Sequence, residues 1–284
     1  MRLVAACAQF TPEKAQLKAN LDRMADWIHQ AAAEKIDLVA FPESATSAYF
    51  LEGGVAECAL GADQLLQELA QRTAGLARPV DAVVGFYEKA ETTHYNSAAY
   101  LELGPHPRLV HVYRKFFLPT YGVFDEDRFV SRGRTLGLAD TRFGKVGLLI
   151  CEDVWHSLLG TLLAVRGTKM MIVPSASPAR GFGGEWPSNV ERYQRMLCSL
   201  SAEHSVYCLN PMLAGFEGGK GFVGASMITN PYGELVMRAP LLEDHLLVSE
   251  IDLDLVDIVR SQLPLLSDLK ARWSLIQSIV QEID

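Results

Sequence analysis

The sequence predicts an α/β fold, in which short buried strands alternate with amphipathic helices. Nearly continuous apolar runs, for example over 36–41 and 144–150, are typical of strands that are buried on both faces. Over 13–34, apolar residues instead recur at helical spacing, which predicts a helix with one apolar face. The chain has 284 residues, of which 49% are hydrophobic, and it shows no obvious repeat. We therefore expect one large domain over 1–284.

Turn signals place the boundaries of these elements in chain order. After a first strand over 3–10, Thr11 is an N-cap candidate, and Pro12 suits the first helical position. Gly-Pro-His-Pro at 104–107 and Asn-Pro-Tyr-Gly at 230–233 mark turns between strands. Further strands are expected at 36–41, 80–88, 95–103, 108–113, 134–140, 144–150, 169–173, 206–210, 222–229, 235–238 and 246–251. Further helices are expected at 61–77, 156–165, 187–204, 253–261 and 267–282.

Two of the predicted segments have a distinctive residue pattern. The stretch 120–133 is loop-like and contains an acidic cluster around Glu126. In the last predicted helix, apolar residues recur at helical spacing, which predicts a face packed on the body of the protein. These residues are Leu269, Trp273, Ile276 and Val280.

Composition excludes several classes of protein. A net charge of −8 argues against nucleic acid or an anionic membrane as a partner. No apolar run approaches the roughly 18 residues of a membrane span, and the apolar start of the chain has no convincing signal-cleavage site. The five cysteines are widely spaced without a C-x-x-C pair, which favours a reducing cytoplasm over a disulfide framework. The seven histidines form no metal-binding motif, so we expect no metal.

The stretch Gly144–Trp155, GKVGLLICEDVW, contains a candidate nucleophile. Its buried strand stops at Cys151, and two acidic residues, Glu152 and Asp153, follow at once. A thiol at the carboxyl end of a buried strand is held rigidly and still lies within reach of a ligand, as in a nucleophile elbow. A purely structural cysteine is the alternative, because free cysteine is among the most buried residue types.

Two other predicted strands also end at a charged residue. Glu43 follows the strand at 36–41, and Lys115 follows the strand at 108–113. A loop carboxylate and a surface lysine are the ordinary interpretations. However, strand ends of one sheet can converge on one crevice, and an acid, a lysine and a thiol suffice for acyl transfer. Glu43 would take the proton of the Cys151 thiol, the thiolate would attack an amide or nitrile carbon, and Lys115 would stabilise the oxyanion.

The motifs around these residues resemble those of the nitrilase superfamily, the carbon–nitrogen hydrolases with a Glu–Lys–Cys triad. The matches are FPE at 41–43, YRKFFLP at 113–119 and ICEDVW at 150–155, and the resemblance covers nearly the whole chain. It implies a four-layer α-β-β-α sandwich that forms a homodimer or a higher homo-oligomer and uses no metal or organic cofactor. It also implies that Glu126 is the family's second glutamate, which positions Lys115 and lines the substrate pocket.

Within the family, LPTYGVFDEDRF and CEDVW resemble the glutaminase domain of glutamine-dependent NAD synthetases. True nitrilases favour Cys-Trp-Glu, whereas Glu152 follows the cysteine here. Tyr121 matches a loop tyrosine of that domain, and Ser177 falls at its Ser-Pro, so Tyr121, Glu152 and Ser177 are expected to bind substrate. Two features depart from the domain: the ARGFGGEW segment after Pro178 does not match it, and the chain ends after the hydrolase fold, without the ATP-using synthetase domain.

Several functions remain open. The first is a stand-alone amidase that hydrolyses a small linear amide, such as glutamine or a related ω-amide, to an acid and ammonia through a cysteine thioester. It predicts a thiol of lowered pKa that iodoacetamide alkylates rapidly. The second is an ammonia-donating subunit of a separate synthetase. A catalytically idle scaffold that keeps the fold for oligomerisation is the third, although the intact triad argues against it. True nitrile hydrolysis is the least expected, given Glu152.

Overall fold

The computed structural model describes residues 1–283 and contains two six-stranded sheets. In the first sheet the strand order is β14-β1-β2-β3-β4-β5, with β1, β2 and β3 parallel to one another and the other pairs antiparallel. Its strands are β1 (Arg2–Gln9), β2 (Leu38–Ala40), β3 (Val80–Ala90), β4 (Thr93–Leu103), β5 (Arg108–Arg114) and β14 (His245–Asp252).

The second sheet has the order β13-β12-β9-β8-β7-β6, with β7, β8 and β9 parallel. Its strands are β6 (Gly137–Thr141), β7 (Gly144–Leu148), β8 (Met170–Ile172), β9 (Tyr207–Asn210), β12 (Met227–Thr229) and β13 (Leu235–Arg238). Both sheets therefore have a parallel centre with antiparallel strands beside it.

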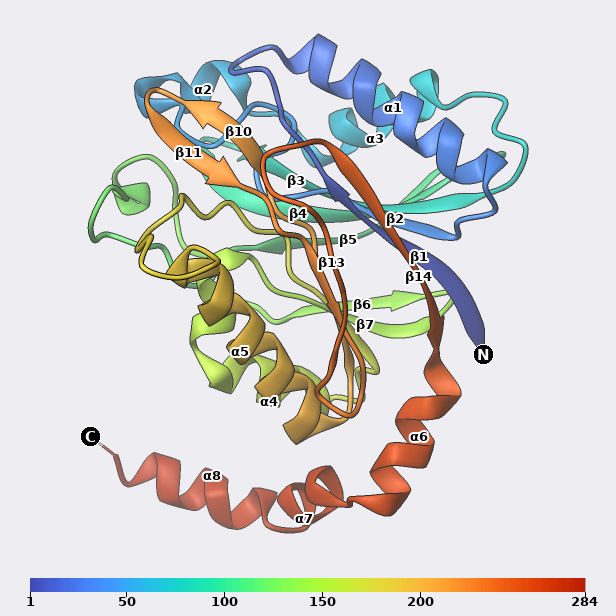
Figure 1. Ribbon diagram of the computed structural model, residues 1–284, viewed down its shortest axis with the longest axis vertical. Helices are drawn as coiled ribbons and strands as arrows, with labels where there is room; N and C mark the ends of the chain where they lie inside the picture. The colour runs from blue at the N-terminus through green and yellow to red at the C-terminus, as the bar shows by residue number, and fades with distance from the viewer. Residues whose placement is uncertain (284) are drawn as a thin grey trace.

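Helices cover the outer face of each sheet, as Figure 1 shows. The first sheet is covered by α1 (Leu17–Ala33) and α3 (Ala62–Arg72), and the second by α4 (Ser157–Val165) and α5 (Ser188–His204). Strand β1 contributes to the packing on both faces of the first sheet, because successive side chains of a strand point to opposite faces. Its Ala6 and Ala8 pack with the helical core, whereas Ala5 and Cys7 belong to the core between the sheets. The predicted four-layer α-β-β-α sandwich is confirmed.

The C-terminal part differs from the prediction. Instead of one helix at 267–282, the chain forms α7 (Leu265–Ala271) and α8 (Trp273–Gln281), which follow α6 (Leu253–Gln262) and are separated at Arg272. Leu266 of α7 is buried against the core. The break at Arg272 then directs α8 away from the body, so that α8 buries no side chain (Figure 1). Of the predicted packed face, Leu269 of α7 packs against the core, but the prediction is wrong for α8, in which no residue is fully buried.

The predicted strand at 222–229 is also wrong, because it is broken at Ala225, whose φ is +64°. Its first part belongs to a hairpin that the sequence analysis did not anticipate, formed by β10 (Ala214–Glu217) and β11 (Lys220–Val223). The two-residue turn of this hairpin, Gly218–Gly219, has positive φ at both positions, as the turn types that suit hairpins require. Four short elements complete the chain: the 3₁₀ turns η1 (Glu52–Gly54), η2 (Glu126–Arg128) and η3 (Cys151–Trp155), and α2 (Val55–Cys58).

Candidate active site

Three strand ends deliver the predicted acid, lysine and thiol. Glu43 lies three residues beyond β2, Lys115 directly follows β5, and Cys151 lies three residues beyond β7. The backbone N–H of Lys115 donates to the carbonyl of Asn96 at 2.8 Å, and that of Cys151 donates to the carbonyl of Pro174 at 2.9 Å. Lys115 and Cys151 are therefore still held to a neighbouring segment after their own strands have ended.

Lys115 lies between two buried carboxylates. Its Nζ is 2.7 Å from Oε1 of Glu43 and 2.7 Å from Oε1 of Glu126, and all three side chains are buried. Burial lowers the pKa of Lys115, but the charges of Glu126 and Glu43 outweigh it, so this pKa lies well above its ordinary value. Burial raises the pKa of Glu126 to about 7, opposed by the Lys115 charge and reinforced by that of Glu43. The structure thus brings three of the four predicted catalytic residues into contact.

Two residues that the sequence analysis missed complete this ionic cluster. Asn96, buried in β4, donates through Nδ2 to Oε1 of Glu43 at 2.8 Å. The hydroxyl of Tyr49 donates to Oε1 of Glu126, and the carbonyl of Tyr49 accepts a bond of 2.7 Å from the Tyr87 hydroxyl. Asn96 could have been found, because a buried amide inside a predicted strand requires a partner.

Cys151 adopts a φ of +47°, a left-handed conformation that is uncommon outside glycine. Its side chain is 5% exposed, and Sγ lies 3.7 Å from the carbonyl oxygen of Ala176. The N–H of Ala176 donates to Oε2 of Glu43 at 2.8 Å. Cys151 and Glu43 therefore both contact Ala176, the thiol at its carbonyl oxygen and the carboxylate at its N–H.

The predicted lowering of the thiol pKa is wrong. Burial raises the pKa of Cys151 well above its ordinary value, and the charge of Glu43 adds to this effect, while Lys115 opposes it. A buried thiol without a compensating cation in direct contact stays protonated, because the charged form loses its hydration. Any nucleophilic role of Cys151 therefore needs a base to remove its proton.

Asp153 connects the two halves of the site, and sequence analysis gave it no role. It is fully buried in η3, two residues after Cys151. It accepts hydrogen bonds from three backbone N–H groups and one hydroxyl, at 2.8 to 3.2 Å. The donors are Ile150, Phe116, Phe117 and the hydroxyl of Tyr113. Its carboxylate thus fixes the turn of Cys151 against the segment that follows Lys115.

The predicted substrate-binding residues are only partly brought together. The Tyr121 hydroxyl, on a half-exposed side chain, donates to Oε2 of Glu152 at 2.9 Å. Ser177 is buried, and its hydroxyl accepts a bond of 3.1 Å from Nδ2 of Asn189 instead. Asn189 and Tyr121 line the same open cavity, of about 420 Å³. Its other lining residues are Trp155, Arg180, Ser188 and Arg192.

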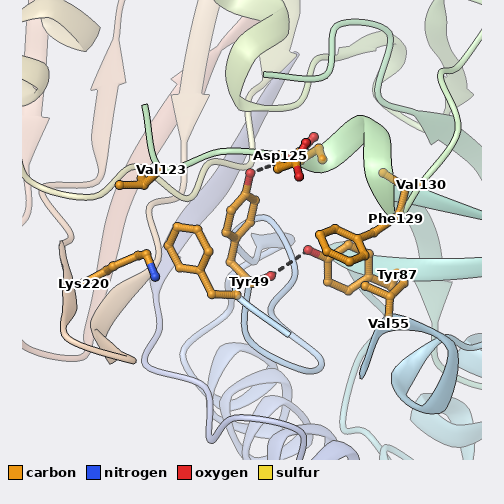
Figure 2. Close-up of a pocket in the computed structure, with 10 residues that line it drawn as sticks. Tyr49, Val55, Tyr87, Val123, Asp125, Phe129, Val130 and Lys220 are labelled. Carbon is orange, nitrogen blue, oxygen red and sulfur yellow. Dashed lines mark hydrogen bonds between the residues drawn. The ribbon is translucent and has the colours of Figure 1, made fainter. Parts of the chain in front are cut away.

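A second cavity, of about 230 Å³, lies beside Glu126 (Figure 2). Figure 2 shows Tyr49 in its wall, with the hydroxyl pointing toward the loop of Asp125 and the carbonyl toward Tyr87. Phe124 contacts residues of both cavities, because its ring packs against Tyr49 and also against Tyr121. Because Glu126 and Tyr49 line the second cavity, the ionic cluster lies next to open space.

Residues 1–283 contain neither a metal-binding cluster nor a membrane-spanning helix. No group of three or more histidine, cysteine, aspartate or glutamate side chains in this range is arranged to hold a metal ion. Within the same range, no helix has both the length and the apolar character that crossing a membrane requires.

Comparison with known proteins agrees with the fold. Residues 4–261 match the family described as carbon–nitrogen hydrolase. The chain therefore belongs to the carbon–nitrogen hydrolases of the nitrilase superfamily, as its motifs predict.

Among curated proteins, the chain is 30% identical over 250 residues to the glutamine-dependent NAD(+) synthetase of Acinetobacter baylyi, covering 88% of this chain and 44% of that protein. It is 27% identical over 254 residues to human omega-amidase NIT2, covering 86% and 87%. The chain thus spans less than half the length of the synthetase and most of the length of the amidase.

Solved structures give the same picture. The glutamine-dependent NAD+ synthetase of Acinetobacter baumannii, in complex with ADP, superimposes with a TM-score of 0.79 at 26% identity, over 90% of this chain and 47% of that one. A carbon–nitrogen hydrolase from Helicobacter pylori G27 gives a TM-score of 0.81 at 24% identity, over 94% and 95%. The second likeness concerns the fold alone.

Proposed function

We propose that the protein is an amidase that hydrolyses the C–N bond of a small linear amide, with Cys151 as nucleophile, Glu43 as base and Lys115 as oxyanion stabiliser. One observation carries this proposal: a buried lysine bridges two buried carboxylates, and one of these, Glu43, contacts the same residue as the thiol. Burying three charged side chains costs free energy of desolvation and adds little to the stability of a hydrophobic core. Perturbed groups that cluster beside a strained thiol are instead typical of active sites.

Acylation would begin with transfer of the Cys151 proton to Glu43. The sulfur then forms a bond to the amide carbon, and the carbonyl oxygen takes the negative charge. Lys115 and the backbone N–H of Glu152 would stabilise this oxyanion. Collapse of the tetrahedral intermediate breaks the C–N bond, and the proton on Glu43 moves to the leaving nitrogen. Ammonia and a thioester on Cys151 result.

Deacylation would use the same groups in the same order. Glu43, again ionised, takes a proton from water, and the hydroxide adds to the thioester carbon. The second tetrahedral intermediate breaks its C–S bond, which releases the carboxylic acid and a thiolate. Glu43 returns its proton to that thiolate. Glu126, in contact with Lys115, would keep the ammonium in place through both halves of the cycle.

For the substrate, we propose glutamine or a related ω-amide. Tyr121 lines the open cavity and donates a hydrogen bond to Glu152, so that a carboxylate beside a phenol could bind a polar end of the substrate. Two of the relatives are named for glutamine dependence and for omega-amidase activity. The match to NAD synthetases also supports a second candidate, an ammonia-donating subunit that works with a separate synthetase.

The test is ammonia release from purified protein over a panel of linear amides and nitriles. Amides, led by glutamine and ω-amides, should release ammonia, and nitriles should not. Cys151→Ala should abolish release and keep the fold by circular dichroism. Cys198→Ala is the matched control, since Cys198 is a partly exposed thiol on α5. Ammonia release by Cys151→Ala at the wild-type rate would contradict the proposal.

We also propose that the chain forms a homodimer or a higher homo-oligomer in the cytoplasm. The support for self-association is an apolar face on α8, where Leu275 and Ile279 are at least half exposed. Exposed apolar patches of this kind mark interaction surfaces. All five cysteines are free, which suits a reducing compartment. Light scattering should show more than one chain per particle, and Ile279→Glu should reduce that mass.

A further inference from the structure

Tyr193 lies against the candidate nucleophile, although no motif pointed to it. It belongs to the second turn of α5, and its side chain is fully buried. Its hydroxyl oxygen is 3.1 Å from Sγ of Cys151, which is within hydrogen-bond reach for sulfur. The indole of Trp155 packs edge-on against the Tyr193 ring, with 5.7 Å between centroids. The phenol is therefore held at the sulfur by packing from two elements.

Chemistry fixes the direction of this hydrogen bond during turnover. Burial and the neighbouring Cys151 raise the pKa of Tyr193 well above its ordinary value, so the phenol keeps its proton. Before reaction, either the hydroxyl or the thiol can donate. Once Glu43 has taken the thiol proton, the sulfur has nothing left to donate. From then on, the Tyr193 hydroxyl is the donor and the sulfur the acceptor.

The other charged groups at the thiol do not duplicate this role. The positive charge of Lys115 lowers the pKa of Cys151. However, the ion pairs of Lys115 are with the carboxylates of Glu43 and Glu126 and not with the sulfur. The remaining contact of the sulfur is the Ala176 carbonyl, which is an acceptor and cannot stabilise negative charge. Among the described residues, the Tyr193 hydroxyl is thus the only hydrogen-bond donor that contacts Sγ.

We propose that Tyr193 is a catalytic residue of this hydrolase, whose hydroxyl donates a hydrogen bond to the Cys151 sulfur whenever the sulfur is anionic. The proposal rests on the proposed function. Two steps create that charge: removal of the proton before attack, and cleavage of the C–S bond when the thioester is hydrolysed. In the neutral thioester between them the sulfur is a poor acceptor. The Tyr193–sulfur hydrogen bond is therefore stronger when the sulfur is anionic, before attack and after C–S cleavage, than in the thioester between these two steps.

The first test is Tyr193→Phe, which keeps the ring and removes the hydroxyl. Loss of a hydrogen bond to a charged group should lower kcat/KM on the amide by about 10- to 100-fold. The rate of Cys151 alkylation by iodoacetamide, followed by mass spectrometry, should reach its midpoint about one pH unit higher than in the wild type. Tyr207→Phe is the matched control, because Tyr207 is a buried tyrosine of β9 on the same core, and both readouts should stay at wild-type values.

A second variant tests the same hydrogen bond if Tyr193→Phe does not fold. Fluorotyrosine at position 193 keeps the hydroxyl and nearly the same shape but is a stronger donor, so the alkylation midpoint should move to lower pH. Alkylation needs no substrate, so this readout holds even if no amide in the panel is hydrolysed. Unchanged midpoints in both variants, with the fold intact, would show that Tyr193 only packs in the core and would overturn the proposal.

Discussion

The carboxylate of Asp153 accepts a hydrogen bond of 2.9 Å from the backbone N–H of Phe117. Asp153 belongs to the turn that starts with Cys151, in the second sheet's half of the protein. Phe117 follows Lys115 by two residues, beyond the edge strand β5 of the first sheet. A single fully buried carboxylate therefore sets the position of the candidate nucleophile relative to the candidate cation, across the interface of the two sheets.

We predict that Asp153→Ala lowers the free energy of unfolding by about 3 kcal/mol, because it leaves several buried N–H groups without an acceptor. Activity should fall more than tenfold, since the turn of Cys151 and the segment after Lys115 can then shift apart. Urea denaturation and ammonia release measure the two effects. Asp140→Ala, at an exposed position of β6, should change the stability by less than about 0.5 kcal/mol. Equal stability of the two variants would contradict this account.

A second prediction concerns the ionic cluster. Lys115→Met leaves Glu43 and Glu126 close together without their shared cation, and should cost about 3 to 5 kcal/mol of unfolding free energy. Adding Glu126→Gln should restore part of that loss, because the like charge disappears. The double variant should therefore be more stable than Lys115→Met alone. A double variant that is no more stable than Lys115→Met would show that removing the Glu126 charge relieves no repulsion, and would contradict this prediction.

The raised pKa of Glu126, about 7, predicts how stability depends on pH. The folded state holds a proton on this carboxyl that the unfolded chain has released above its own pKa, near 4.5. The contribution of this proton to the free energy of unfolding is fully present below about pH 4.5 and is lost as the pH rises through 7. The slope is at most about 1.4 kcal/mol per pH unit. In Glu126→Gln the part of the slope that Glu126 supplies should vanish, while Asp153 and Asp81, whose pKa values burial raises to about 6, still contribute. Urea denaturation at a series of pH values in both proteins tests the sign: a wild-type stability that rises relative to the variant over this window would refute it.

The sequence allowed the acid, the lysine and the thiol to be predicted for a physical reason. Glu43, Lys115 and Cys151 each follow an apolar run, and the strands that end there are close enough for Lys115 to meet Glu43 at 2.7 Å. Asp153 and Tyr193 could not be found in this way. Their roles depend on which backbone N–H groups and which sulfur the folded chain places beside them, and neither spacing nor composition contains that information.

The errors in the fold have similar causes. Helical periodicity predicted an apolar face at the C-terminus, but periodicity does not show whether the body offers a surface to pack on, and no residue of α8 is fully buried. The hairpin of β10 and β11 did have a local signal, the Gly218–Gly219 turn. Its strands are only four residues long, which is too short for alternation to be visible.

A final prediction concerns Gly85, inside β3. A Cβ at this position would come within 2.2 Å of the Pro42 carbonyl oxygen and 2.7 Å of the Glu43 Cα, both of which are backbone atoms that cannot rotate away. Gly85→Ala must therefore displace the segment that carries Glu43. Overpacking of a core typically costs about 1 to 3 kcal/mol, and the displaced carboxylate should reduce ammonia release at least tenfold. Gly54→Ala, where a Cβ would meet no atom closer than 4.0 Å, is the matched control and should alter neither property. A Gly85→Ala protein with normal activity would mean that this side of the site tolerates movement of Glu43, and that the contact with Lys115 is not what holds the base in place.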